Sequence, residues 1–181
     1  MKTGLRRGTV RLEKHQPSWT RNAEETIFSL SRILEGAAKK IEHVGSTAVS
    51  SIKAKPIIDI VIGTDDFEKI LEKDDQLKKE GFILRQDERP EQLLYVRGDL
   101  NRDFITHHIH VVLYNSKQWN NYLDFRDYLD SNEEIAKRYE SLKEELAEIY
   151  PTDRKSYTEA KSGFIAKLLI EAKKWREEDS K

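Results

Sequence analysis

The stretch from Ile41 to Gly63, IEHVGSTAVSSIKAKPIIDIVIG, holds the residues that are hardest to explain as packing. A turn with the sequence Gly-Ser-Thr comes before a nearly all-apolar run that contains one carboxylate, Asp59. A run of this composition is typical of a strand in the middle of a sheet, covered on both faces. A carboxylate there is costly unless it is paired, hydrogen-bonded or bound to a metal. Asp59 is therefore a candidate catalytic and metal-binding residue.

The turn is formed by Gly45, Ser46 and Thr47 and is a candidate phosphate site. A glycine at a strand end lets the backbone turn tightly and approach a ligand closely. The hydroxyls and free backbone N–H groups that follow can hold phosphate oxygens. Gly-Ser pairs are common in turns, so this pair carries weight only together with the features around it. Lys55, just before the strand, could reach the same phosphates or simply be a surface lysine.

The segment 103–114 predicts a long strand with two different faces. Its odd positions are mostly aliphatic and form a core face, on which His107 points inward. His108 and His110 project together from the more polar face. They could bind a transition metal, or one could act as a general acid or base near neutrality, with His110 preferred. Alternatively, they hydrogen-bond phosphates or neighbouring side chains.

His43 stands beside the Gly-Ser-Thr turn and is a further candidate metal ligand. A simple hydrogen bond at the strand end is the alternative. Together with Asp59, His108 and His110 it offers ligand types that suit zinc, although the spacing does not require such a site.

Two cations of the C-terminal third fall on apolar helix faces. Arg126 lies on the aromatic stripe of the helix predicted from Lys117, and Lys161 lies among apolar positions of the last helix. Such a cation could simply extend its charged end to water. Both helices should line the edge of a cleft, however, so we expect both side chains to bind ligand phosphates, Arg126 bidentately.

Several of these segments together resemble one protein family. HVGSTAV followed by KPIIDI is similar to the GrpB family, small bacterial proteins with a nucleotidyltransferase-like fold. The similarity extends over about Thr9 to Ala172 and includes the further motifs HIH at 108–110, RDYL at 126–129 and Tyr157…Lys161…Phe164-Ile165. The resemblance implies an α+β fold with a mixed β-sheet, flanking helices and a C-terminal helical segment.

The resemblance also implies roles for the site residues. In nucleotidyltransferases the triphosphate lies on the turn, so Ser46 would contact a phosphate and Asp59 would hold a divalent metal, Mg²⁺ or Mn²⁺ rather than Zn²⁺. These enzymes usually carry two carboxylates two residues apart, whereas the same-face neighbours of Asp59 are Ile57 and Val61. One carboxylate cannot easily assemble two magnesium ions. Either another segment supplies a ligand, or the site binds a nucleotide without transfer.

Two functions follow as hypotheses. The first is a metal-dependent nucleotidyltransferase, and the second is a non-catalytic module that binds a nucleotide or phosphorylated metabolite. GrpB-like domains also occur fused to dephospho-CoA kinase, which favours an accessory role. Nucleic-acid binding through the basic segment 1–22 is disfavoured by the net charge of −1.

Composition indicates one domain of 181 residues, without disulfides because cysteine is absent. No apolar run has the length of a membrane span, and the N-terminus does not resemble a signal peptide, so we expect a cytoplasmic location and no membrane partner. No feature specifies an oligomeric state. We expect a sheet part at about 1–115 and a helical part at about 116–181.

Periodicity and turn residues predict the elements that position these side chains. The predicted helices are 18–34, 67–80, 117–129, 132–149 and 155–175; the predicted strands are 40–44, 56–62, 82–86, 93–97 and 103–114, with a turn at Pro90.

Overall fold

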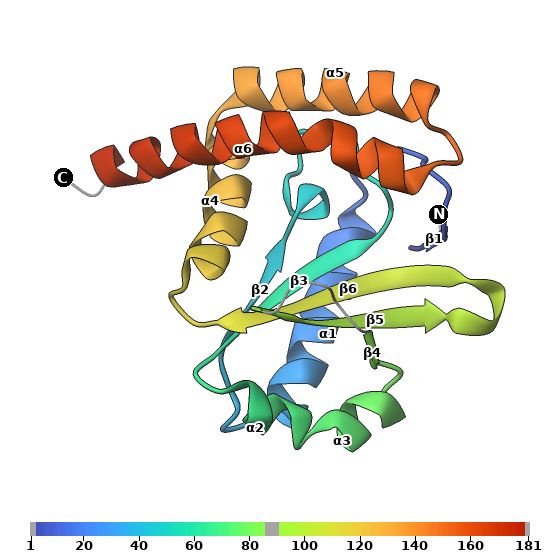
Figure 1. Ribbon diagram of the computed structural model, residues 1–181, viewed down its shortest axis with the longest axis vertical. Helices are drawn as coiled ribbons and strands as arrows, with labels where there is room; N and C mark the ends of the chain where they lie inside the picture. Colours follow the sequence, from blue (N-terminus) through green and yellow to red (C-terminus); the bar gives the residue numbers. More distant parts are fainter. Residues whose placement is uncertain (1–2, 86–90, 180–181) are drawn as a thin grey trace.

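The computed structural model describes residues 3–85 and 91–179, which form a mixed sheet with helices around it (Figure 1). The strands are β1 Leu5–Arg6, β2 Ala38–Val44, β3 Ile58–Thr64, β4 Ile83–Arg85, β5 Leu93–Asp99 and β6 Phe104–Leu113. The helices are α1 Pro17–Ile33, α2 Phe67–Leu71, α3 Asp74–Lys79, α4 Lys117–Ser131, α5 Glu133–Ile149 and α6 Arg154–Asp179, with short 3-10 turns at Ser46–Ala48 and Leu100–Arg102. The predicted α+β class with a mixed sheet is confirmed.

The sheet has the strand order β2-β3-β6-β5-β4, and β1 pairs with β6. Strands β3 and β6 run parallel, whereas the other pairs are antiparallel. The parallel pair is central to the site, because it places two segments that lie far apart in the sequence side by side.

One face of the sheet is covered by α1. The N-terminal position of this helix is a proline, Pro17, and the chain leaves it through Gly36 with φ 77°. Both positions suit these residues. The backbone N–H that proline lacks would have no acceptor within the first turn of a helix, and glycine tolerates positive φ. Its apolar face, including Trp19 and Leu30, packs on alternate isoleucines of β3. Burial of this face is the main force that fixes α1 on the sheet.

The other face of the sheet is partly covered by α4, through Trp119, which packs with Val61 and Val112. A second apolar core joins α4, α5 and α6 and includes Leu129, Tyr139 and Leu168 and the segment after the 3-10 turn at Ser46–Ala48. In Figure 1, α5 and α6 run next to each other on one side of the strands, with α2 and α3 on the opposite side. The division into a sheet part and a helical part within one domain stays a prediction.

Some predicted boundaries were wrong. The predicted helix 67–80 is two short helices, α2 and α3, because Asp74 and Asp75 begin a new first turn, where acidic side chains are favoured. The predicted strand from Pro56 begins only at Ile58. Gln86 and the predicted turn at Pro90 lie outside the described residues.

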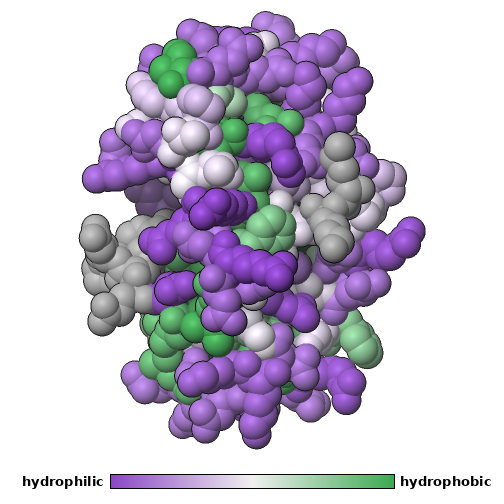
Figure 2. Space-filling view, turned by 90° about the vertical axis from the view of Figure 1, so that its right-hand side faces the viewer, coloured by the Kyte–Doolittle hydropathy of each residue, from purple (hydrophilic) through white to green (hydrophobic). Residues whose placement is uncertain are grey.

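Hydrophilic residues dominate the face of the molecule in Figure 2, and hydrophobic residues are exposed there in smaller groups. Among the helices of the described residues, none is both long and apolar enough to cross a membrane.

Candidate functional site

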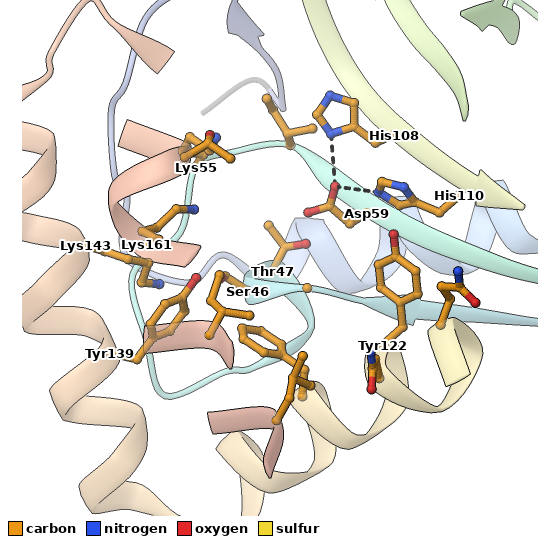
Figure 3. Close-up of a pocket in the computed structure, with 18 of the residues that line it drawn as sticks. Ser46, Thr47, Lys55, Asp59, His108, His110, Tyr122, Tyr139, Lys143 and Lys161 are labelled. Carbon is orange, nitrogen blue, oxygen red and sulfur yellow. Dashed lines mark hydrogen bonds and ion pairs between the residues drawn. The ribbon is translucent and has the colours of Figure 1, made fainter. Parts of the chain in front are cut away.

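A pocket of about 650 Å³ lies between the sheet and the C-terminal helices (Figure 3). Residues of β3, β6 and the turn after β2 line it on one side, and residues of α4, α5 and α6 line it on the other. Eight residues that the sequence singled out are among its lining: Gly45, Ser46, Thr47, Lys55, Asp59, His108, His110 and Lys161. The structure therefore brings most of the predicted site residues together, and two, His43 and Arg126, do not line this pocket.

Asp59 meets both histidines because β3 and β6 are parallel neighbours, with Asp59 directly opposite His108 in the register. Its Oδ1 lies 3.0 Å from Nδ1 of His108 and 3.8 Å from Nε2 of His110. Burial alone would raise the pKa of Asp59, but its interactions with the two histidines, among them the hydrogen bond from His108, outweigh burial and hold this pKa well below its usual range. Asp59 is therefore a carboxylate at neutral pH.

His108 is held in one tautomer. The Nη2 atom of Arg154 lies 3.2 Å from its Nε2. A guanidinium can only donate, so Nε2 must accept, and the ring proton sits on Nδ1 and is donated to Asp59. Burial of the ring lowers the pKa of His108, with Arg154 adding to the effect and Asp59 opposing it. His108 is therefore a neutral link between a carboxylate and a guanidinium.

His110 shares the pocket face but has a different environment. Its ring lies 5.0 Å from the ring of Tyr122, measured between centroids. Its Nδ1 atom is buried and has no hydrogen-bond partner among the described residues. His107 points to the opposite side, as predicted, where it is buried and lies 3.2 Å from the hydroxyl of Thr26 on α1.

Four cations line the same pocket: Lys55 from the segment before β3, Lys143 from α5, and Arg154 and Lys161 from α6. Within the described residues, none of the four has a carboxylate at ion-pair distance. The ammonium groups of Lys55 and Lys161 instead lie 5.2 and 4.5 Å from the ring centre of Tyr157. That of Lys143 lies 4.8 Å from the ring centre of Tyr139 and donates to the carbonyl of Lys53.

The positive charges of the three lysines are poorly balanced by nearby negative charge. Burial and the neighbouring cations lower the pKa of Lys55 to about 7 and that of Lys161 to about 8. Burial, with the charge of Lys161, lowers the pKa of Lys143 to about 7. A bound anion would reverse this effect, since an opposite charge favours the protonated amine. The lysine end of the pocket is therefore suited to a negatively charged ligand.

The sequence reasoning missed Lys143 and Arg154. Lys143 carries a signal that could have been found, because it stands four residues after Tyr139 and three before Leu146, on the buried stripe of α5. Arg154 begins α6 and has no such signal. Tyr157 also lines the pocket, and within residues 3–85 and 91–179 its buried hydroxyl lacks a hydrogen-bond partner.

The Gly-Ser-Thr turn has the tight geometry that was expected. Gly45 has φ 70° and ψ −172°, and a 3-10 turn follows from Ser46 to Ala48. Ser46 lies beside Tyr139 at the pocket (Figure 3). Thr47 is fully buried, and its hydroxyl lies 3.0 Å from Nε2 of His43. Ser46 is thus the turn hydroxyl that faces the pocket, where it interacts with the side chain of Tyr139.

His43 is not brought together with the other proposed metal ligands. It pairs with Ile60 in the β2–β3 ladder, so its side chain is on the α1 face, opposite to that of Asp59. Burial lowers its pKa to about 4. The arrangement agrees with the alternative given for His43, a simple hydrogen bond at the strand end.

Arg126 also differs from its prediction, because it is engaged within the protein. Its Nη1 lies 2.9 Å from Glu42 and 2.9 Å from the carbonyl of His43, and its Nε lies 2.7 Å from Asp127. Asp127 in turn lies 2.6 Å from Arg176 of α6. Arg126 therefore joins α4 to β2 and, through Asp127, to α6.

We expect Arg126→Met to destabilise the protein by about 2 kcal/mol without changing the affinity of the pocket for ligands. The variant leaves Glu42 and the His43 carbonyl without the donor that α4 provides. Urea denaturation measures the first effect and ligand titration the second. Arg138→Met, on the exposed side of α5, is the control. A large loss of affinity in the folded Arg126 variant would contradict this assignment.

The residues do not fit a two-metal centre. Among the described residues, no group of three or more histidine, aspartate or glutamate side chains is arranged to hold a metal ion. The reason is visible at His108, whose proton faces Asp59 and whose lone pair faces Arg154. The same-face neighbours of Asp59 are aliphatic, and the surrounding cations repel another positive charge.

The pocket has a second, less charged part. Tyr122 and Phe125 of α4 line it, together with Ile165 and Leu169 of α6 and the amide of Asn121. Aromatic rings and amides of this kind suit a flat, polar ring system. The site therefore combines a cationic part with a part that can hold a ring.

Comparisons with known proteins agree with this fold. The family model described as "GrpB protein" matches residues 9–171. The chain is 38% identical to "Glutamate-rich protein GrpB" of Alkalihalophilus pseudofirmus over 172 residues, which cover 93% of this chain and 98% of that protein. Its alignment with YqkA of Bacillus subtilis has 29% identity and covers 92% of this chain but only 48% of that protein.

Several solved structures are similar, among them the following two. The crystal structure of GrpB from Enterococcus faecalis has a TM-score of 0.83 at 32% identity and covers 91% of this chain and 99% of that one. The Cid1 poly(U) polymerase with MgGTP bound has a TM-score of 0.51 at 13% identity, over 75% of this chain and 44% of the Cid1 chain. The second likeness shows a nucleotidyltransferase-like fold and extends to the fold alone.

Proposed function

This chain belongs to the GrpB family, and we propose that its pocket binds a nucleotide or another phosphorylated small molecule. The observation that carries the proposal is the convergence of Lys55, Lys143, Lys161 and Arg154 on one pocket without carboxylate partners among the described residues. Phosphate groups would supply the missing negative charge and accept hydrogen bonds from these donors.

The orientation of the ligand follows from the two parts of the pocket. Phosphates would lie against the lysines and Ser46, and a base or other ring would lie toward Tyr122 and Phe125. Cid1, which shares the fold, has been solved with MgGTP. This supports a nucleotide as one form of the ligand.

Nucleotidyl transfer by two metal ions is not supported by the residues of this pocket. Asp59 is a single carboxylate already hydrogen-bonded to His108, and the fit to a metal centre fails as described above. Binding without turnover, as in an accessory module, is the function that these side chains support best.

Lys161→Gln is expected to weaken the binding of nucleoside triphosphates by roughly tenfold to a hundredfold, because it removes a largely desolvated charge–phosphate contact. Calorimetric titration with a panel of triphosphates and coenzyme A precursors measures this effect. Lys167→Gln, on the exposed side of the same helix, is the matched control and should bind as the unaltered protein does. Equal affinities of the two variants would contradict the proposed location of the phosphates.

A further inference from the structure

The cationic end of the pocket has an excess of positive charge that a magnesium site would not have. Four side chains with cationic groups surround it. The carboxylate that acts on Lys55, Lys161 and Arg154 is Asp59, and the charges of Glu140 and Glu144 act on Lys143. In an ordinary two-metal site the balance is the reverse: carboxylates provide negative charge, and metal ions neutralise the phosphates. Here the protein already carries the positive charge that the metals would bring.

The cations come from three separate segments and reach the same space. Figure 3 shows the side chains of Lys55, Lys143 and Lys161 on one side of the pocket, across from Asp59 and the two histidines, with Ser46 and Thr47 between. Their ammonium groups lie over two different tyrosine rings: those of Lys55 and Lys161 over Tyr157, and that of Lys143 over Tyr139. The positive charge is therefore spread along the pocket wall, which matches a chain of phosphates better than a single one.

A second observation also points to a ligand. The hydroxyl of Tyr157 is buried in the pocket lining, on a residue with 0% exposure, and no residue in the described part of the chain offers it a hydrogen bond. A buried hydroxyl without a partner is unfavourable unless something binds to it. A phosphate oxygen held between Lys55 and Lys161 would accept this hydrogen bond.

Asp59 has a different role in this arrangement from that of a metal ligand. Its Oδ1 accepts from His108, 3.0 Å away, and the other nitrogen of His108 accepts from Arg154, 3.2 Å away. The carboxylate therefore fixes the histidine tautomer, and the histidine orients the guanidinium. Asp59 is a positioning residue and an internal counter-charge.

We propose that this pocket binds a ligand of two or more linked phosphates in its metal-free form, with Lys55, Lys143, Lys161 and Arg154 taking the place of divalent metal ions. This rests on the proposed function, since it specifies how the same pocket recognises its phosphates. It also predicts that Mg²⁺ competes with the protein for the ligand, because a magnesium complex carries less negative charge.

The test is calorimetric titration of the full chain with pyrophosphate, in buffer with EDTA and in buffer with excess Mg²⁺. Binding is expected in EDTA, at least tenfold tighter than that of inorganic phosphate, and weaker by about threefold or more in Mg²⁺. Binding that requires Mg²⁺ would overturn the metal-free proposal and leave the proposed function standing. Absence of binding in both buffers would overturn both.

Asp59→Asn separates the two models by the sign of its effect. A metal ligand replaced by asparagine should lose affinity, whereas removal of a counter-charge should leave pyrophosphate affinity in EDTA unchanged or raise it by about threefold. Asp130→Asn, exposed on α4, is the control for loss of one negative charge elsewhere. Should Asp59→Asn fail to fold, Lys143→Gln tests the same proposal, because it removes one of the four cations. It must weaken pyrophosphate binding in EDTA by about tenfold or more, and an unchanged affinity overturns the proposal.

Discussion

Replacing Lys55 and Lys161 together by methionine is expected to stabilise the protein and at the same time to weaken ligand binding. Both ammonium groups lie in a pocket where burial and other cations lower the lysine pKa values to about 7 and 8. Methionine keeps a similar shape and removes the repulsion. We expect the free energy of unfolding near pH 6 to rise by on the order of 2–4 kcal/mol.

The dependence of stability on pH provides a second readout of the same effect. The folded protein releases protons from Lys55, Lys143 and Lys161 near pH 7 to 8, whereas the unfolded chain keeps them up to about pH 10. Between these limits the unfolded state binds more protons, so stability rises with pH. We expect this rise between about pH 7 and pH 9.5, below the range in which tyrosines ionise, and a smaller rise in the double variant.

Urea denaturation at several pH values measures both effects, and pyrophosphate titration measures binding. Lys167→Met, on the exposed side of α6, should change the free energy of unfolding by no more than about 0.5 kcal/mol. A double variant that loses stability along with affinity would show that the two lysines hold the fold together, contrary to the role given to them here.

Gly45→Ala is expected to have the second large effect, a loss of about 3 kcal/mol of stability together with loss of pyrophosphate binding. Gly45 has φ 70° and ψ −172°, a conformation that other residues adopt only at a cost of about 1–3 kcal/mol. A Cβ atom there would lie 2.7 Å from Oδ2 of Asp59. The turn would have to move away from Asp59, and this would displace Ser46 from the phosphate end of the pocket.

Gly163→Ala is the matched control for this change. Gly163 lies within α6, where an added Cβ meets nothing within 4 Å. Alanine is the better helix former, so this variant should gain about 0.5–1 kcal/mol and bind normally. Denaturation curves and pyrophosphate titrations of both variants decide the matter, and wild-type binding by Gly45→Ala would refute a site built on this turn.

The sequence predicted well where the signal is local. The alternation of polar and apolar residues in 103–114 placed His108 and His110 on one face and His107 on the other, and the structure has this arrangement. The stop at Gly36 was also predicted correctly, because it depends on the backbone of one residue. The family motif gave the fold class, which the similar solved structures confirm.

The prediction was less successful for charged side chains on helices. Arg126 and Lys161 look alike in the sequence, since each lies on an apolar helix face. Arg126 meets Glu42 of β2, however, and Lys161 meets the pocket. Lys143 was overlooked on the stripe of α5, where it turns out to be 2% exposed. Which element faces such a side chain is decided by how the helices pack.

By itself the sequence determined that Asp59 is the unusual residue of its strand and that two histidines share a face with each other. Both conclusions depend on strand periodicity and on the cost of a buried charge, which are local properties. Only the tertiary structure decided what surrounds Asp59. The parallel register of β3 and β6 brings His108 to it, and the packing of α5 and α6 adds three cations to Lys55 where metal ligands were expected. Contacts of this kind join residues about 50 to 100 positions apart, so no local pattern encodes them.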